Sequence, residues 1–350
     1  MRILFDARSV RTPSGCYVFQ GLTKAWRCDP RVSGVVAAVP GSFDRSMVPE
    51  GVEVIPMRGG SWAVHYLSEL RRLTDQCRAD VLFCPNGISP RDPRAVLYFQ
   101  DMFHFRIDGG ATNLMRLVPR NVVRASWRRL SSDSAKLGIC VSRHICEEVR
   151  KRVRLPSIVV YNGVDIGEAT WSGEENCVFV LGGIGHRKDE QTAIRAWSTI
   201  PFAARRDVLL RIGGVEPASR RASLRALAAT LGIGREVSVV GTLPRHMYLE
   251  EIAKARVVVS CSRMEAFSLP VAEAILMGAP VLCTTIASHL ELIKETGAGA
   301  SFATRDHAQL ATAIGAALSG TAPPRLQVPL SGWSWDSRAR QHIDAYVSRE

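Results

Sequence analysis

The chain has 350 residues, of which 46% are hydrophobic and 22% are charged, the composition of an ordinary globular protein. Its length is about twice that of a common domain, so we expect two domains, each with its own core. No apolar run reaches the roughly 18 residues that a membrane-spanning helix needs, and the opening residues predict a strand rather than a signal peptide. The sequence therefore predicts a cytoplasmic protein.

The net charge of +12 is concentrated in the first half of the chain. Residues 1–170 hold 25 Lys and Arg against 16 Asp and Glu, whereas residues 171–350 hold 20 against 17. Such a basic field attracts phosphate groups on small molecules, membranes or nucleic acid, although an arginine-rich composition without a specific partner explains it equally well. The sequence shows no nucleic-acid-binding motif, so nucleic acid is not expected as a partner.

The nine cysteines predict neither disulfides nor a metal site. There is no C-x-x-C pair, and the spacing of Cys140 and Cys146 is not that of metal ligands. We expect reduced and mostly buried thiols. An acidic cluster of the D-x-D type is also missing, so the sequence predicts no metal and no other cofactor.

The first predicted unit consists of a strand, a loop and a helix. The strand covers residues 3–6 and the helix residues 16–27, and the loop between them carries Arg8, Arg11 and Gly15. In a parallel sheet this loop lies at the carboxyl edge, where ligands bind. An ordinary connection between strand and helix is the alternative.

Strands and helices then alternate, which predicts a parallel sheet. Predicted strands cover residues 34–39, 52–55, 80–84 and 95–99, with a helix over 62–78. The last strand ends in Gln100-Asp101-Met102-Phe103-His104, which places a carboxylate and an imidazole at a carboxyl end. Asp101 and His104 are therefore candidate site residues, although a lone histidine is more often structural.

Arginines recur every four residues at Arg116, Arg120, Arg124 and Arg128. Past the interruption at Pro119 they would form a basic stripe on one face of a helix. A solvated surface is the usual explanation for such a stripe. A phosphorylated ligand or the headgroups of a membrane would also fit it.

A turn sequence, Asn162-Gly163-Val164-Asp165, precedes the second predicted domain. A strand over 177–181 then leads into Gly182-Gly183-Ile184-Gly185-His186-Arg187-Lys188, and a glycine-rich turn from strand to helix indicates a phosphate site. A dinucleotide fingerprint would require glycine or alanine at Lys188, and no G-K-[ST] follows, so neither a dehydrogenase nor a P-loop enzyme is predicted. Arg187 and Lys188 instead offer positive charge to a diphosphate.

Two further strands end in glycine-containing loops at the same predicted edge. They cover residues 208–212 before Gly213-Gly214 and residues 237–240 before Gly241-Thr242. We expect the backbone of these loops to frame a nucleotide base.

The stretch from Ser262 to Val281 is the most informative part of the chain. A β-branched strand over 255–260 leads into Glu265, and Pro270 opens a short helix that carries Glu273 and stops at Gly278. The positive end of a helix favours an anion, and a carboxylate accepts hydrogen bonds from sugar hydroxyls, so this corner suits a ligand with both phosphate and sugar. Alternatively, Glu273 only complements the helix dipole and Glu265 is solvated.

The order of these motifs resembles that of the family 4 retaining glycosyltransferases. The resemblance is carried by Glu265-Ala266-Phe267-Ser268-Leu269-Pro270 with Glu273, by Asn162-Gly163-Val164-Asp165, and by Trp333-Ser334-Trp335-Asp336 at the start of a terminal helix. Ala266 and Ser268 stand where the family usually has glycine. The resemblance implies the GT-B fold, an α/β class with two doubly wound Rossmann-like domains that face each other across a cleft. The implied domains are residues 1–168, completed by the helix over 333–350, and residues 169–325.

The resemblance also implies an activity, the metal-independent transfer of a hexose, with mannose as first guess, from a nucleoside diphosphate sugar with retention at the anomeric carbon. The acceptor would be a hydroxyl of a glycan, a glycolipid or a small molecule. A phosphorylated or lipid-linked acceptor is one form of this expectation. By the resemblance, the donor sugar is bound by Glu265, Phe267, Ser268 and Leu269, and the ribose by Glu273. The diphosphate is neutralised by Lys188 and Arg187, and the base is framed by Gly241 and Thr242. The acceptor enters from the first domain, near Gly15, Asp101 and His104. Gly183 stands where the family has Arg, so either Arg187 substitutes or the leaving group is less stabilised.

Three alternatives remain at this stage. A nucleotide-sugar 2-epimerase shares the architecture, and a nucleic-acid binder would explain the charge. A catalytically weak or inactive partner subunit would explain the departures at Gly183, Ala266 and Ser268. Because the stripe from Arg116 to Arg128 is basic, we also expect a peripheral contact with the inner face of a membrane.

Overall fold

The computed structural model describes residues 1–100, 127, 129–326 and 332–348. The chain forms two compact units, which we describe separately. Unit 1 consists of Met1–Gly163 and Gly332–Glu350, and unit 2 of Val164–Ser331. The sequence analysis placed the corresponding limits at residues 168, 325 and 333.

Unit 1 is built on a seven-stranded sheet in the order β3-β2-β1-β4-β5-β6-β7, with every neighbouring pair parallel. The strands are β1 (Arg2–Asp6), β2 (Gly34–Val39), β3 (Glu53–Pro56), β4 (Val81–Cys84), β5 (Ala95–Phe99), β6 (Leu137–Cys140) and β7 (Ser157–Val159). The helices are α1 (Pro13–Cys28), the 3-10 helix η1 (Arg45–Met47), α2 (Trp62–Val64), the π-helix η2 (His65–Glu69), α3 (Leu70–Gln76), α5 (Arg143–Arg150) and α13 (Trp335–Val347). The central strands are apolar and buried, as in parallel sheets covered by helices.

Unit 2 repeats this design with a six-stranded parallel sheet in the order β10-β9-β8-β11-β12-β13. The strands are β8 (Glu175–Leu181), β9 (Leu209–Gly213), β10 (Val237–Val239), β11 (Ala255–Ser260), β12 (Val281–Thr284) and β13 (Ala300–Phe302). The helices are η4 (His186–Lys188, 3-10), α6 (Glu190–Thr199), α7 (Phe202–Arg205), α8 (Ala218–Thr230), α9 (Arg245–Lys254), α10 (Leu269–Leu276), α11 (Ala287–Thr296) and α12 (His307–Leu318).

The strand order reverses direction once in each sheet. In unit 1 the reversal falls between β1 and β4, and in unit 2 between β8 and β11. Open α/β sheets bind ligands beyond the carboxyl ends of the strands at this switch point, because the loops there diverge. In unit 2 the two loops concerned are residues 182–188 and 261–268, so the fold places both predicted ligand loops next to each other.

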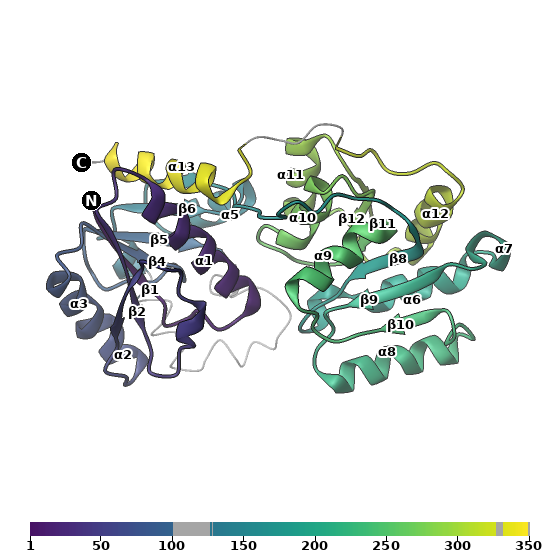
Figure 1. Ribbon diagram of the computed structural model, residues 1–350, viewed down its shortest axis with the longest axis horizontal. Helices are drawn as coiled ribbons and strands as arrows, with labels where there is room; N and C mark the ends of the chain where they lie inside the picture. The colour runs from purple at the N-terminus through teal and green to yellow at the C-terminus, as the bar shows by residue number, and fades with distance from the viewer. Residues whose placement is uncertain (101–126, 128, 327–331, 349–350) are drawn as a thin grey trace. The chain divides into compact units, whose positions relative to one another are not determined.

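The terminal helix α13 completes unit 1 by packing on α1, although residues 29–334 separate the two helices in the chain (Figure 1). Ser334 caps α13 by accepting a hydrogen bond from the Ser337 backbone N–H over 3.2 Å. The Trp335 indole lies against two glycines, where an added Cβ would stand 2.3 Å from the ring at Gly21 and 2.4 Å at Gly163. Glycine is therefore required at both positions for this contact.

Two local expectations were inaccurate. Helix α1 begins at Pro13 rather than at Cys16, because Thr12 caps it and Pro13 suits the first turn, so Gly15 lies inside the helix and not in a loop. The single helix predicted over residues 62–78 is interrupted by the π-turn η2. None of the helices in the described ranges is long and apolar enough to cross a membrane.

Candidate active site

Three charged side chains meet at the switch point of unit 2. Lys188 Nζ lies 2.8 Å from Glu265 Oε1, and Arg187 Nη1 donates to Glu265 Oε2 over 2.6 Å. Ser262 Oγ also donates to Glu265 Oε1, over 2.9 Å. The fold thus brings together the predicted diphosphate residues on one loop and the predicted sugar residue on the other.

The environment keeps Glu265 ionised. Burial alone would raise the pKa of this carboxyl, but the charges and hydrogen bonds of Lys188 and Arg187 outweigh burial and lower it to about 2. Lys188 itself is only 6% exposed. Glu265 and Lys188 therefore form an ion pair inside the protein, whereas the Arg187 side chain is 35% exposed.

Gly183 makes room for the stem of Lys188. An added Cβ at Gly183 would stand 3.0 Å from Lys188 Cε and 3.2 Å from Cγ. At Gly182 an added Cβ would stand 2.4 Å from the Gly213 carbonyl oxygen, which is an impossible approach. The lysine can thus lie flat along the glycine loop and point its ammonium group at Glu265.

A second charged group, which the sequence analysis did not identify, fixes the same loop. Glu190 is fully buried, forms an ion pair with Arg220, and accepts from the Gly183 backbone N–H over 3.2 Å. Arg220 Nη1 also donates to His186 Nδ1 over 2.8 Å. The residues that flank Arg187 and Lys188 are therefore tied to α6 and α8. Glu190 directly follows the glycine-rich loop, and this was the sequence signal that could have revealed it.

Glu273 lies in α10 and has one cationic partner. It is 2% exposed, and its Oε1 accepts from Arg245 Nη1 over 2.9 Å. Burial raises the pKa of this carboxyl, and Arg245 offsets part of that rise. Arg245 also donates from Nη2 to the Asp165 carbonyl over 2.6 Å. No sequence motif pointed to Arg245, which begins α9.

Tyr248, on the same helix as Arg245, has a buried hydroxyl. Within the part of the chain that the structure describes, this hydroxyl has no hydrogen-bond partner. Burial raises the pKa of Tyr248 far above its ordinary value, and the nearby charge of Glu273 adds to the rise. A buried hydroxyl without a partner is costly and often marks a functional site.

The remaining donor-site candidates lie in loops at the same edge of the sheet. Phe267 and Ser268 are both 4% exposed, and Leu269 is the first residue of α10. The Thr242 backbone N–H donates to Glu216 Oε1 over 3.3 Å, and Gly241 is adjacent, since an added Cβ there would stand 2.9 Å from the same oxygen. Glu216 therefore holds the loop that we predicted to frame the base.

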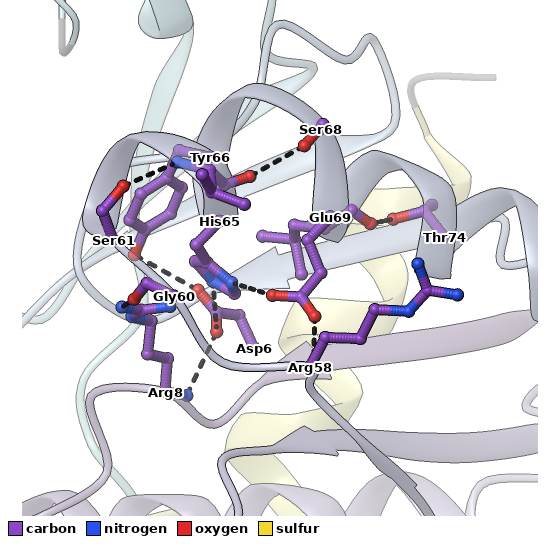
Figure 2. Close-up of polar contacts among 12 residues, drawn as sticks. Asp6, Arg8, Arg58, Gly60, Ser61, His65, Tyr66, Ser68, Glu69 and Thr74 are labelled. Carbon is purple, nitrogen blue, oxygen red and sulfur yellow. Dashed lines mark hydrogen bonds and ion pairs between the residues drawn. The ribbon is translucent and has the colours of Figure 1, made fainter.

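Unit 1 has a buried polar cluster at its own switch point, where β1 ends (Figure 2). His65 Nε2 lies 3.2 Å from Asp6 Oδ1, and His65 Nδ1 lies 3.5 Å from Glu69 Oε2. Asp6 also accepts from the Arg8 backbone N–H over 3.1 Å and from the Tyr66 hydroxyl over 3.3 Å. The cluster anchors the first loop to the π-helix η2, which is itself a rare element that often occurs at functional sites.

Several predicted residues lie outside the described residues. These are Asp101 and His104, and the arginines Arg116, Arg120, Arg124 and Arg128. Gly15 belongs to unit 1, in the first turn of α1. Among the described residues, no three or more His, Cys, Asp or Glu side chains are grouped so that they could hold a metal ion.

Two parallel sheets, with charged residues on a glycine-rich loop at the switch point of unit 2, define an α/β protein of the Rossmann-like class. Two family models match the chain and together span residues 30–327. Residues 30–168 match the model for Glycosyltransferase Family 4, and residues 165–327 match the model for Glycosyl transferases group 1. The chain belongs to the family 4 glycosyltransferases, which confirms the family predicted from the sequence.

Glycosyltransferases are also found among the solved structures that share this fold. A sucrose-phosphate synthase from Thermosynechococcus elongatus has a TM-score of 0.75 at 15% identity, covering 99% of this chain and 98% of that one. WaaG, a glycosyltransferase involved in lipopolysaccharide biosynthesis, has a TM-score of 0.72 at 19% identity, with 98% and 95% covered. Anabaena HepE in complex with UDP and glucose has a TM-score of 0.69 at 17% identity, with 100% and 97% covered. The predicted GT-B fold class is confirmed. No curated protein sequence matches the chain.

Proposed function

We propose that this glycosyltransferase moves a hexose from a nucleoside diphosphate sugar to a hydroxyl group, with retention at the anomeric carbon and without a metal ion. The observation that carries the proposal is the contact of Glu265 with Lys188 and Arg187 at the switch point of unit 2. This arrangement supplies two cations for a diphosphate and a carboxylate for sugar hydroxyls, all in direct contact.

Donor binding would exchange the partners of these charges. Phosphate oxygens would accept hydrogen bonds from Lys188 and Arg187. Sugar hydroxyls would then donate to Glu265 in place of these two cations. In the reaction, the bond between the anomeric carbon and the diphosphate oxygen breaks, and the acceptor oxygen bonds to the same face of that carbon. The acceptor proton passes to a departing phosphate oxygen. Lys188, Arg187 and the first backbone N–H groups of α10 would stabilise the charge that develops on the leaving group.

The second carboxylate would recognise the nucleoside. Glu273 is buried beside Arg245, and ribose hydroxyls would donate to it. Uridine is the first base to test, because HepE has been solved with UDP and with UDP-glucose. Mannose from a guanosine diphosphate donor was the guess from the sequence and belongs in the same screen. The acceptor would be a glycan, glycolipid or small molecule in the cytoplasm or at the inner face of a membrane.

A thermal-shift screen of nucleoside diphosphates and their sugar conjugates tests the proposal. A ligand present at about 100 times its Kd stabilises the folded protein by about 2.7 kcal/mol, which is easily measured. Lys188→Ala is expected to abolish the shift. Lys294→Ala, which removes an exposed lysine on α11, serves as the matched control and should leave it unchanged.

Hydrolysis of the selected donor then tests the chemistry without knowledge of the acceptor. Proton NMR of the sugar first released should show the anomer of the donor, whereas the opposite anomer would contradict retention. Equal activity with and without a metal chelator is expected. Nucleotide binding without hydrolysis or transfer would instead favour the inactive partner subunit, and release of a sugar altered at C2 would favour the epimerase.

A further inference from the structure

Ser268 begins α10 in a backbone conformation that side chains rarely adopt. Its φ of 74° and ψ of 67° lie in the left-handed region. Residues other than glycine are strained there, because the Cβ approaches the following carbonyl. The strained turn is nevertheless the start of α10, since the Ser268 carbonyl accepts from the backbone N–H groups of Val271 and Ala272, both over 3.1 Å. A contact with the rest of the protein must offset the strain of this backbone conformation in a residue that is not glycine.

That contact is a buried histidine on the next helix. His289 lies in α11 and is fully buried, and its Nε2 stands 3.2 Å from Ser268 Oγ. Its Nδ1 stands 3.1 Å from both the carbonyl oxygen and Oγ1 of Thr284. The imidazole therefore bridges the end of β12 and the start of α10.

The direction of each hydrogen bond follows from the available protons. The Thr284 hydroxyl donates to the Ser262 carbonyl, so both Thr284 oxygens can only accept from His289 Nδ1–H. Burial lowers the pKa of His289 to about 4, which leaves the ring neutral at pH 7 and Nε2 bare. The Ser268 hydroxyl must then donate to Nε2. Ser262 links this network to the sugar-site carboxylate, since its carbonyl accepts from Thr284 and its Oγ donates to Glu265.

We infer that His289 is a positioning residue of the donor site, which accepts the Ser268 hydroxyl proton and so holds the left-handed turn that presents the backbone of residues 267–269 to the donor sugar. The inference rests on the proposed function, since it assigns His289 to the same site. His289 acts through Ser268 and is not a catalytic residue. The hydrogen bond between Ser268 and His289 thus stabilises a left-handed backbone conformation that glycine would adopt without strain.

Two conservative substitutions separate the two hydrogen bonds of His289. The amide oxygen of glutamine reaches far enough to replace Nε2 as the acceptor for Ser268, whereas asparagine reaches only the position of Nδ1 and retains Thr284. We expect His289→Asn to weaken binding of the nucleoside diphosphate sugar about tenfold. His289→Gln should remain close to the wild type. Calorimetry measures both affinities, and far-ultraviolet circular dichroism verifies that the variants are folded.

Rescue by glycine distinguishes positioning from general stability. In the His289→Asn background, Ser268→Gly should restore the affinity to within about twofold of the wild type, because glycine adopts the left-handed conformation unaided. Ser268→Gly alone supplies the reference affinity against which the double variant is compared. The control is His307→Ala, which removes an exposed histidine at the start of α12. Additive losses in the double variant, or equal losses for Gln and Asn, would overturn the inference.

The nucleoside diphosphate without its sugar separates this inference from the proposed function. If the wild type binds neither the diphosphate nor the conjugate, the proposed function fails and the role of His289 fails with it. If every variant binds the diphosphate and His289→Asn binds the conjugate as tightly as the wild type, only the role of His289 is refuted.

Discussion

Glu265 is the counter-charge of two cations, the buried Lys188 and the partly exposed Arg187. Its pKa of about 2 lies below the ordinary value of 4.5, so the stabilisation from its ionised form is complete above pH 4.5 and is lost as the pH falls toward 2. One pKa unit corresponds to about 1.4 kcal/mol, so the full effect is about 3 kcal/mol.

Glu265→Gln is therefore expected to lower the free energy of unfolding of unit 2 at pH 7 by about 3 kcal/mol, since it leaves Lys188 and Arg187 without a counter-charge. The same variant should lose less stability than the wild type between pH 4.5 and 2.5. Urea unfolding at several pH values measures both. An acid dependence as steep as that of the wild type would show that the carboxylate is not held by these cations.

Tyr248 presents the opposite case, a buried polar group without a partner among the described residues. A hydroxyl in this state destabilises the folded protein by about 1–3 kcal/mol. Tyr248→Phe keeps the ring against Phe179 and should raise the melting temperature of the ligand-free protein. A lower melting temperature would mean that the hydroxyl has a partner after all.

At the scale of secondary-structure elements, the docking of α13 on α1 depends on the absence of two side chains. Gly21→Ala would place a methyl group 2.3 Å from the Trp335 ring, so the tryptophan must move and the terminal helix loosens. We expect unit 1 to lose about 1–3 kcal/mol of stability. Hydrogen exchange of residues 335–347 should increase in this variant.

Gly315→Ala provides the matched control, because Gly315 also lies within a helix but has no atom within 4 Å of an added Cβ. This substitution should stabilise α12 by up to about 1 kcal/mol through helix propensity. If both alanines had the same effect, the Trp335 contact would not be the cause.

Elements were predictable from the sequence where local pattern and burial agree. The strands β2 and β11 were predicted with the bounds that the structure shows, because a parallel strand buried on both faces is mostly apolar. The π-turn η2 was not predictable, because His65 within it contacts Asp6, which is 59 residues away in the chain. Arg245 and His289 were missed for the same reason: each is a single polar residue on a helix, and only the tertiary fold supplies its partner.

At the scale of the whole molecule, both units follow one plan. Each has a parallel sheet with its order reversed between the first and fourth strands of that unit, and each places charged residues at that reversal. Asp6 occupies it in unit 1, and Lys188 with Glu265 in unit 2. The charged residues at the switch point of unit 2 were predictable from the sequence, because a glycine-rich loop precedes them. Asp6 of unit 1 was not predictable, because no local motif surrounds it.

Because the two units have separate cores, a change confined to one core should affect that unit alone. His342 lies on α13 among the rings of Trp26, Phe83 and Tyr98, and its Nδ1 is 3.3 Å from the Tyr346 hydroxyl. Burial lowers the pKa of this histidine to about 3, against about 6.5 in an unfolded chain. Between pH 6.5 and pH 3 this histidine is therefore protonated in the unfolded chain and neutral in the folded unit. The stability of unit 1 falls as the pH drops through this range.

His342→Gln removes this titration. Between pH 7 and pH 5 the wild type should lose about 2 kcal/mol more stability in unit 1 than the variant does, because each pH unit below 6.5 costs up to about 1.4 kcal/mol. Hydrogen exchange followed by mass spectrometry resolves peptides of the two units, so unit 2 serves as the internal control and should respond equally in both proteins. An equal response in unit 1 would mean that His342 already carries a proton in the folded state, and a change in unit 2 would mean that the two cores do not unfold independently.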